Sequence, residues 1–373
     1  MQCVVTSPPY WGLRDYHIGG QIGLERTPEE YVATMVEVFR EIWQVLRDDG
    51  TVWLNLGDSY AHGIPGGNCV FENGRTDGRI FYETDKARGR EKRATMAPGF
   101  KPKDLIGMPW RVAFALQADG WYLRSDIIWH KSNPMPESVT DRPTKAHEYI
   151  FLLSKSADYY YDATAIAEPS SGTAHSRGGG VHPKSAEMGS GIKQNSSFSM
   201  AVRELVSVRN RRSVWTINTE PTPEAHFATF PQALVMPCIL AGTSAKGACA
   251  RCGTPWGRIT EREKVVQTGI TPKQAGYRAQ GLASNKSTIG RTKAWDADEG
   301  KVTTLGWRPS CKHTDAGIKP CLVLDPFAGS ATTLIVAERL GRIGIGLELS
   351  AEYIEIAKRR TSQRGLMFTS MRE

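Results

Sequence analysis

Apolar residues in this chain fall into short runs that are separated by long polar stretches. Residues 3–5 and 51–56 are runs rich in β-branched side chains, which predict buried strands. Between them, residues 28–47 carry apolar side chains at helical spacing, and Pro28 suits the first turn of a helix. The opening of the chain therefore predicts a strand, a helix and a second strand.

The same alternation returns later in the chain. We predict helices over 105–118, 230–241, 330–340 and 351–364, and strands over 121–131, 149–154, 321–325 and 342–349. Strands that alternate with helices indicate an α/β domain with a doubly wound, mostly parallel sheet. Residues 62–100, 168–200 and 264–305 are polar and lack periodicity, so we predict long loop insertions there. The first of them is basic, especially over 75–93.

Charge and cysteine content narrow the class of protein. The 373 residues have a formal net charge of +8, which favours a polyanionic partner such as DNA or RNA. Seven cysteines are too few for a disulfide scaffold, and the chain shows neither a secretory signal nor an apolar window of membrane-spanning length. We therefore expect a cytoplasmic, reduced protein without a membrane partner, in which close cysteine pairs bind metal more often than they form disulfides.

A glycine-containing turn follows the predicted strand 321–325. The segment Leu-Val-Leu-Asp-Pro-Phe-Ala-Gly-Ser-Ala-Thr-Thr (322–333) ends a strand and opens a helix, which is the general nucleotide site of α/β proteins. About twenty residues on, Glu348 follows the next strand, where its carboxylate can hold two ribose hydroxyls. Dinucleotide enzymes share this arrangement, so it leaves the ligand open.

A second segment ends the first strand: Thr-Ser-Pro-Pro-Tyr-Trp (6–11). Two prolines stiffen the backbone, so that the carbonyl of Pro8 and the hydroxyl of Ser7 can point at one spot. Tyr10 can stack on a planar base. By itself the segment is also compatible with a plain turn.

Taken together, the two segments resemble the DNA amino-methyltransferases that modify cytosine N4 or adenine N6, in the permuted class whose catalytic motif comes first. Ser7, Pro8, Pro9 and Tyr10 match the catalytic motif, residues 325–333 match the cofactor motif, and residues 225–231 resemble the segment that wraps the cofactor. The resemblance covers residues 3–163, 208–262 and 306–362. It departs from the family at Ala331, where a glycine is usual, and in a Gly-Asp segment that usually precedes the catalytic motif.

The resemblance implies the fold of S-adenosylmethionine-dependent methyltransferases and a set of site residues. S-adenosylmethionine would be bound by Asp325, Phe327, Gly329, Ser330, Thr332, Glu348 and Phe230. Ser7 and the Pro8 carbonyl would hold the amine of a flipped base, with Tyr10 stacked on it. Serine at the first motif position favours cytosine N4 over adenine N6. A homodimer and a restriction endonuclease partner would also fit the family.

Four residues form a candidate zinc set. Cys249 and Cys252 are spaced as in a zinc knuckle, and Cys311 and His313 would complete a tetrahedron if the polar stretch between the pairs loops out. Four unlinked residues are the alternative. Such a zinc would be structural, because its four positions would all be filled.

Between the two motifs, residues 168–215 correspond to the place where the family reads its target. Arg203, Arg209, Arg211 and Arg212 are the candidate DNA contacts, and a solvated basic loop is the alternative.

We accordingly divide the chain into five parts. Residues 1–167 form the catalytic half, 168–215 the target-recognition region, 216–248 the cofactor-wrapping segment and helix, 249–320 the Cys/His insert, and 321–373 the cofactor-binding half. Besides double-stranded DNA methylation, three alternatives stay open: methylation of RNA, methylation of a protein amide, and a DNA-binding relic that has lost its cofactor.

Overall fold

The computed structural model describes residues 1–13, 15–16, 18–61, 84–85, 90–91, 100–101, 103–169, 208–220, 230–262 and 302–369. These residues cluster into two units, which we describe separately. Unit 1 comprises residues 1–166, 212–257 and 307–373, and unit 2 comprises 167–211 and 258–306.

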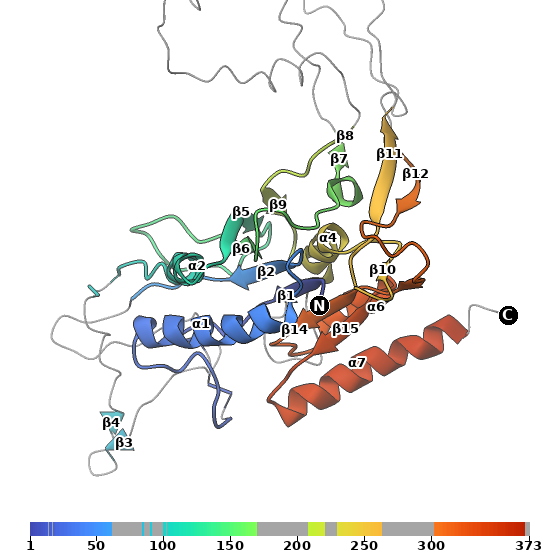
Figure 1. Cartoon of the computed structure of the whole chain (residues 1–373). Coiled ribbons are helices and arrows are strands. Elements are labelled where there is room, and N and C mark those ends of the chain that lie inside the picture. Colours follow the sequence, from blue (N-terminus) through green and yellow to red (C-terminus); the bar gives the residue numbers. More distant parts are fainter. Residues whose placement is uncertain are drawn as a thin grey trace, which may run out of the picture. The chain divides into compact units, whose positions relative to one another are not determined.

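Unit 1 is built on a seven-stranded sheet with the order β15-β14-β1-β2-β6-β5-β9 (Figure 1). The strands are β1 (Cys3–Thr6), β2 (Thr51–Leu56), β5 (Tyr122–His130), β6 (His147–Ser154), β9 (Val214–Thr216), β14 (Leu322–Asp325) and β15 (Ile343–Gly346). The pairings β15/β14, β14/β1, β1/β2 and β5/β9 are parallel. The sheet is therefore mostly parallel, as predicted.

Strand β6 runs opposite to both of its neighbours, β2 and β5. Residues 131–146 join β5 to β6 without a helix among them. Without a crossover helix, the chain returns beside β5 in the antiparallel direction. Strand β6 is the reason why the sheet is mostly, and not strictly, parallel.

Helices cover both faces of the sheet. On one face lie α1 (Pro28–Val45) and α2 (Met108–Ala118), and on the other lie α4 (Gln232–Gly242) and the 3₁₀ turn η1 (Ala163–Ile166). Helix α6 (Thr332–Arg339) packs on α4, and α7 (Ala351–Thr369) follows β15. The sheet is thus doubly wound, with one apolar core on each face.

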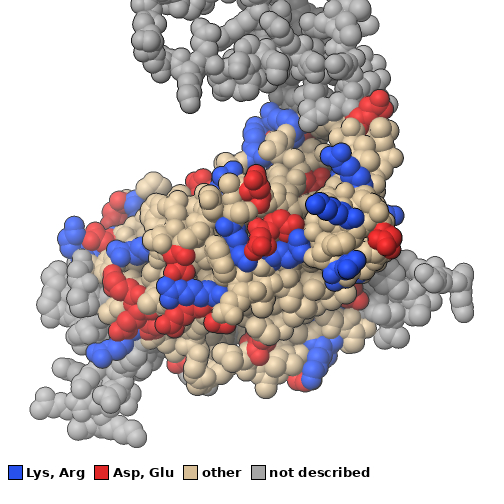
Figure 2. Space-filling model, viewed as in Figure 1, with Lys and Arg blue, Asp and Glu red and all other residues tan. Residues whose placement is uncertain are grey.

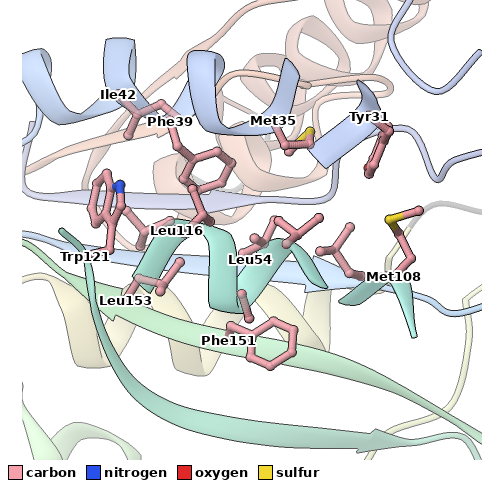
Figure 3. Close-up of a cluster of buried hydrophobic side chains, with 14 of the residues drawn as sticks. Tyr31, Met35, Phe39, Ile42, Leu54, Met108, Leu116, Trp121, Phe151 and Leu153 are labelled. Carbon is pink, nitrogen blue, oxygen red and sulfur yellow. The ribbon is translucent and has the colours of Figure 1, made fainter. Parts of the chain in front are cut away.

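Alternation along the strands supplies both cores. Val4, Val52 and Leu54 point into the α1/α2 core, whereas Val5 and Trp53 point into the α4 core. Figure 3 shows the first core, in which Tyr31, Met35 and Phe39 of α1 face Leu116 of α2 and Leu54 of β2. The apolar periodicity of residues 28–47 is confirmed as the buried face of α1.

Helix boundaries follow local sequence. Helix α1 begins after Thr27, whose hydroxyl accepts a hydrogen bond from the Glu30 N–H while the Glu30 carboxylate accepts one from the Thr27 N–H. Helix α2 begins at Met108 rather than at the predicted residue 105, because Leu105 pairs with Tyr60 as an extended residue.

Short strand pairs account for the remaining elements. In unit 1, β10 (Ala248–Cys249) pairs with β13 (Ile318–Lys319), and β3 (Thr84–Asp85) pairs with β4 (Arg90–Glu91). In unit 2, β7 (Glu168–Pro169) pairs with β8 (Val208–Arg209). Strands β11 (Gly257–Arg262) and β12 (Val302–Arg308) also pair, with most of their residues in unit 2.

Candidate functional site

Both sequence motifs lie at the same edge of the sheet. Strands β1 and β14 are parallel neighbours, so Ser7 and Pro326, which directly follow them, leave the sheet side by side. Strand β2 ends at this edge as well, and the reversed strand β6 begins there. The edge where parallel strands end is the usual ligand site of open α/β sheets.

Asp325 joins the two motifs. One carboxylate oxygen accepts hydrogen bonds from the Thr6 hydroxyl at 2.7 Å and the Phe327 N–H at 3.1 Å, and the other accepts one from the Thr333 hydroxyl at 2.7 Å. The side chain is fully buried. Burial raises the pKa of Asp325 to about 6, and the hydrogen bonds from Thr333 and Thr6 oppose that rise. Asp325 therefore fixes the turn after β14 against the end of β1.

The turn itself depends on two residues with positive φ. Gly329 has a φ of +49°, and nothing lies within 4 Å of the place where a Cβ would stand. Ala331, at the position where the family carries a glycine, has a φ of 64° and directly precedes α6. An L-residue in this region costs about 1 to 2 kcal/mol. The alanine thus keeps the glycine-like backbone path at the expense of some strain.

Glu348 lies beside this turn. One of its carboxylate oxygens accepts a hydrogen bond from the Gly329 N–H at 2.7 Å, and the other accepts one from the Ser350 N–H at 2.9 Å. The preceding strand passes close to the turn, since a Cβ on Gly346 would stand 2.7 Å from the Ala328 Cβ. The half-buried carboxylate is therefore positioned by backbone contacts next to the open space at Gly329.

The remaining candidate cofactor residues differ in exposure. Ser330 is buried, and its hydroxyl and carbonyl both accept hydrogen bonds from Arg360 at 2.5 Å. Thr332 is buried as well. Phe327 and Phe230 are half-buried, Phe327 against the α1/α2 core and Phe230 against the α4 core. Residues 225–229 of the predicted wrapping segment lie outside the described residues.

The backbone of the Ser-Pro-Pro-Tyr segment is hydrogen-bonded to helix α1. Pro8 is buried, while Ser7 and Pro9 are half-buried. The carbonyl of Pro9 accepts a hydrogen bond from the hydroxyl of Tyr31, a fully buried residue of α1, at 2.8 Å. Helix α1 thereby fixes the backbone that presents the Ser7 hydroxyl and the Pro8 carbonyl.

Tyr10 is anchored at its hydroxyl. It donates a hydrogen bond to the Glu148 carboxylate at 2.7 Å, and its ring packs on Gly57, where a Cβ would stand 2.5 Å from the ring. Burial, followed by the charge of Glu148, raises the pKa of Tyr10 well above its ordinary value. The phenol is therefore a fixed, neutral group.

Glu148 and two of its partners, Asn55 and Lys131, were not predicted as site residues. Its carboxylate also accepts hydrogen bonds from Asn55 Nδ2 at 3.1 Å and from the Lys131 ammonium. From the sequence, His147 and Glu148 could suggest a catalytic pair, but a structural role at the start of a strand is favoured. A further local signal is Asn55, a polar residue inside an otherwise apolar strand.

The four candidate zinc ligands converge in unit 1. The ligand atoms of Cys249, Cys252, Cys311 and His313 all lie within 4.8 Å of one another. The stretch between the two pairs passes through β11 and β12, as the hypothesis of one site required.

The structure describes three of the four candidate DNA contacts. Arg209 lies in β8 and donates a hydrogen bond to Glu168 of β7 at 2.9 Å, Arg211 is half-buried and Arg212 is exposed. Arg203 lies outside the described residues, as does most of the basic stretch 75–93. On the face drawn in Figure 2, the described Lys and Arg side chains lie among Asp and Glu side chains.

The two units group residues from several of the predicted parts of the chain. Residues 212–215 belong to unit 1, where β9 is an edge strand of the sheet. The Cys/His region is divided between the units at residues 257–258 and 306–307. Across the described residues, no helix has the length and apolar character of a membrane span.

Comparison with known proteins identifies the family of the chain. The family model of N6/N4 DNA methylases matches residues 1–249 and 319–359. The Type II methyltransferase M.SmaI of Serratia marcescens is 40% identical over 97% of this chain and 84% of its own length. M.Cfr9I of Citrobacter freundii is 37% identical over 96% of this chain and 81% of its own length. The solved structure of the PvuII DNA methyltransferase (cytosine-N4-specific) covers 95% of this chain and 77% of its own, with 16% identity and a TM-score of 0.47. The chain belongs to the N6/N4 family of DNA methylases.

Proposed function

We propose that this protein transfers a methyl group from S-adenosylmethionine to the N4 amine of cytosine in double-stranded DNA. The observation that carries the proposal is the junction of the two motifs, where the Thr6 hydroxyl donates to the Asp325 carboxylate at 2.7 Å. This contact puts the Ser-Pro-Pro-Tyr segment next to the turn that ends β14. The segment that we propose to bind the amine and the turn that we propose to bind the nucleoside thus share one edge of the sheet.

The residues at the turn fit the cofactor. The open side of Gly329 admits a ligand close to the backbone, and the Glu348 carboxylate beside it suits ribose hydroxyls. Bound there, S-adenosylmethionine would supply a methyl group activated by its positive sulfur. Because Asp325, Ser330 and Thr332 are buried, we assign them to shaping the turn, and leave ligand contact to Phe327, Gly329, Glu348 and Phe230.

The catalytic segment would act on the amine of a flipped base. A base amine is a poor nucleophile because its lone pair is delocalised into the ring. If the Ser7 hydroxyl and the Pro8 carbonyl accept its two N–H groups, the nitrogen turns toward a tetrahedral geometry and its lone pair becomes available. Tyr10, held by Glu148, would support the base by stacking.

Cytosine N4 is favoured over adenine N6 by the serine at position 7. The adenine enzymes of the family more often carry aspartate there. We assign target reading to residues 168–215, with Arg209, Arg211 and Arg212 as candidate contacts to phosphates or guanine edges.

The test combines binding with product analysis. Calorimetry of the chain with S-adenosylmethionine should show binding, and mass spectrometry of digested, initially unmethylated DNA should show N4-methylcytosine. N6-methyladenine in its place would overturn the base assignment alone, whereas absence of both binding and product would overturn the proposed activity.

The variant Ser7→Ala separates catalysis from binding. We expect methyl transfer to fall by at least about 100-fold, because positioned groups contribute on that scale, while cofactor binding stays within about twofold. Loss of both together would mean that Ser7 supports the fold rather than the reaction.

A further inference from the structure

Three thiols and an imidazole form a compact group in unit 1, outside the proposed methylation site. The ligand atoms of Cys249, Cys252, Cys311 and His313 lie within 4.8 Å of one another, with Cys249 Sγ and His313 Nδ1 3.9 Å apart. Ligands about 2.3 Å from a tetrahedral zinc ion stand about 3.8 Å from one another. We propose that these residues bind one structural Zn²⁺ through three thiolates and one imidazole nitrogen. This inference does not depend on the proposed function.

The backbone around the first two cysteines is shaped as a metal knuckle. The Gly253 N–H donates to the Cys249 carbonyl at 2.8 Å, and the Cys249 N–H donates to the Thr254 carbonyl at 2.9 Å. Gly253 has a φ of +75°, where any other residue would be strained. This tight turn brings the two thiols, three positions apart, to the same side of the chain.

The second pair of ligands is brought back by strand pairing. Residues 248–249 of β10 pair antiparallel with residues 318–319 of β13, and the Ala250 N–H donates to the Gly317 carbonyl at 3.2 Å. The segment that contains Cys311 and His313 therefore returns to the knuckle by a path that main-chain hydrogen bonds fix independently of any metal.

The donor set suits zinc and excludes the hard cations calcium and magnesium. Calcium and magnesium need oxygen ligands, whereas thiolate and imidazole suit zinc. A redox-active cysteine pair would explain two thiols but neither the third thiol nor the imidazole, and none of the six cysteines among the described residues forms a disulfide. Four protein ligands fill a tetrahedron and leave no position for water, which is typical of a structural site.

The knuckle is also bonded to the start of the central strands. Gln2 donates from Nε2 to the Gly253 carbonyl at 2.8 Å and accepts from the Leu322 N–H at 2.7 Å. Arg47 donates to the Cys252 carbonyl and to the Thr254 hydroxyl. Gln2 directly precedes β1, and Leu322 begins β14. The ion would lie at the edge opposite the methylation site, and would hold residues 249–252 and 311–313 together where the intervening stretch leaves and rejoins unit 1.

The decisive measurement is the metal content of the full chain, purified without chelators and without a metal-affinity step. Elemental mass spectrometry should find about one zinc per chain. The variants Cys252→Ser and His313→Ala should lose most of it. Cys238→Ala, which removes a buried thiol outside the cluster, should keep it and serves as the matched control.

X-ray absorption on the parent protein keeps the proposal testable if the ligand variants fail to fold. The zinc edge should report three sulfurs at about 2.3 Å and one nitrogen at about 2.0 Å. A folded parent that contains no zinc, or ligand variants with as much zinc as the parent, would overturn the proposal. A chain that holds zinc but methylates no DNA would contradict only the proposed function.

Discussion

Tyr10 has two separable parts, a ring that can support a base and a hydroxyl that is bonded to Glu148. Base stacking on an aromatic residue contributes about 1 to 3 kcal/mol per base. Tyr10→Ala should therefore lower methylation by about 5- to 150-fold. Tyr10→Phe keeps the ring, so its methylation should fall clearly less than that of Tyr10→Ala.

Steady-state methylation of one DNA substrate, with cofactor binding measured in parallel, checks this order. Equal losses for Tyr10→Phe and Tyr10→Ala would place the role of Tyr10 in its hydroxyl instead of its ring.

Asp325 should make the protein more stable in mild acid than at neutral pH. Its pKa is raised to about 6 from an ordinary value of 3.8. Between these values the folded protein holds a proton that the unfolded chain has lost, so this group's contribution to stability falls as pH rises through the window. The full effect is about 3 kcal/mol.

Asp325→Asn removes that titration and keeps the size of the side chain. The Thr333 hydroxyl, which also lies 3.3 Å from the Val5 carbonyl, can then accept from the amide and donate to that carbonyl. We expect the slope of unfolding free energy against pH between about 4 and 6 to flatten in denaturant titrations. An unchanged slope would show that the pH dependence of stability comes from other groups.

For individual residues, the sequence identified the two motifs but not the side chains that hold the motifs in place. Ser7 and Glu348 were named from their positions after strands. The contact between Tyr10 and Glu148 joins residues 138 positions apart, and nothing in the local pattern of either residue predicts it. Only the reversed strand β6 brings them together.

Among the elements, the end of β2 is adapted to the catalytic segment. A Cβ on Gly57 would stand 2.5 Å from the Tyr10 ring, and Gly57 has no positive φ that would strain an alanine. Gly57→Ala should thus displace the ring without unfolding the strand. We expect methylation to fall by at least about tenfold, a loss of about 1.4 kcal/mol, with little change in thermal unfolding. A fully active variant would show that the ring is free to move.

Strand and helix positions were largely predictable, and strand direction was not. Apolar runs and helical periodicity located α1, β2, β14 and α7, because one face of each element is buried. The direction of β6 depends on the connection 131–146, whose composition does not distinguish a return loop from a crossover. Helix α2 begins three residues after its predicted start because Leu105 is extended and pairs with Tyr60.

For the molecule as a whole, the two cores of unit 1 share their strands. Because neighbouring residues of β1 and β2 enter opposite cores, neither core can be lost without disrupting the other. Ile42→Val in the α1/α2 core and Ile239→Val in the α4 core should each cost about 0.5 to 1.5 kcal/mol. Their effects should add in the double variant, since the sites lie on opposite faces.

Urea unfolding followed by tryptophan fluorescence and by circular dichroism checks this expectation. Both probes should shift together in both single variants. A variant that moved one transition and left a second in place would show that the cores unfold independently.

The position of β1 has a consequence for synthesis of the chain. Strand β1 lies in the middle of the sheet, and its Thr6 hydroxyl bonds to a carboxylate 319 residues later in the chain. At about 5 to 20 residues per second, roughly 15 to 60 s pass before that partner is made. During that time β1 has an unpaired apolar edge, which favours aggregation. Newly made chains should therefore depend on chaperones more than a protein whose central strands are neighbours in sequence.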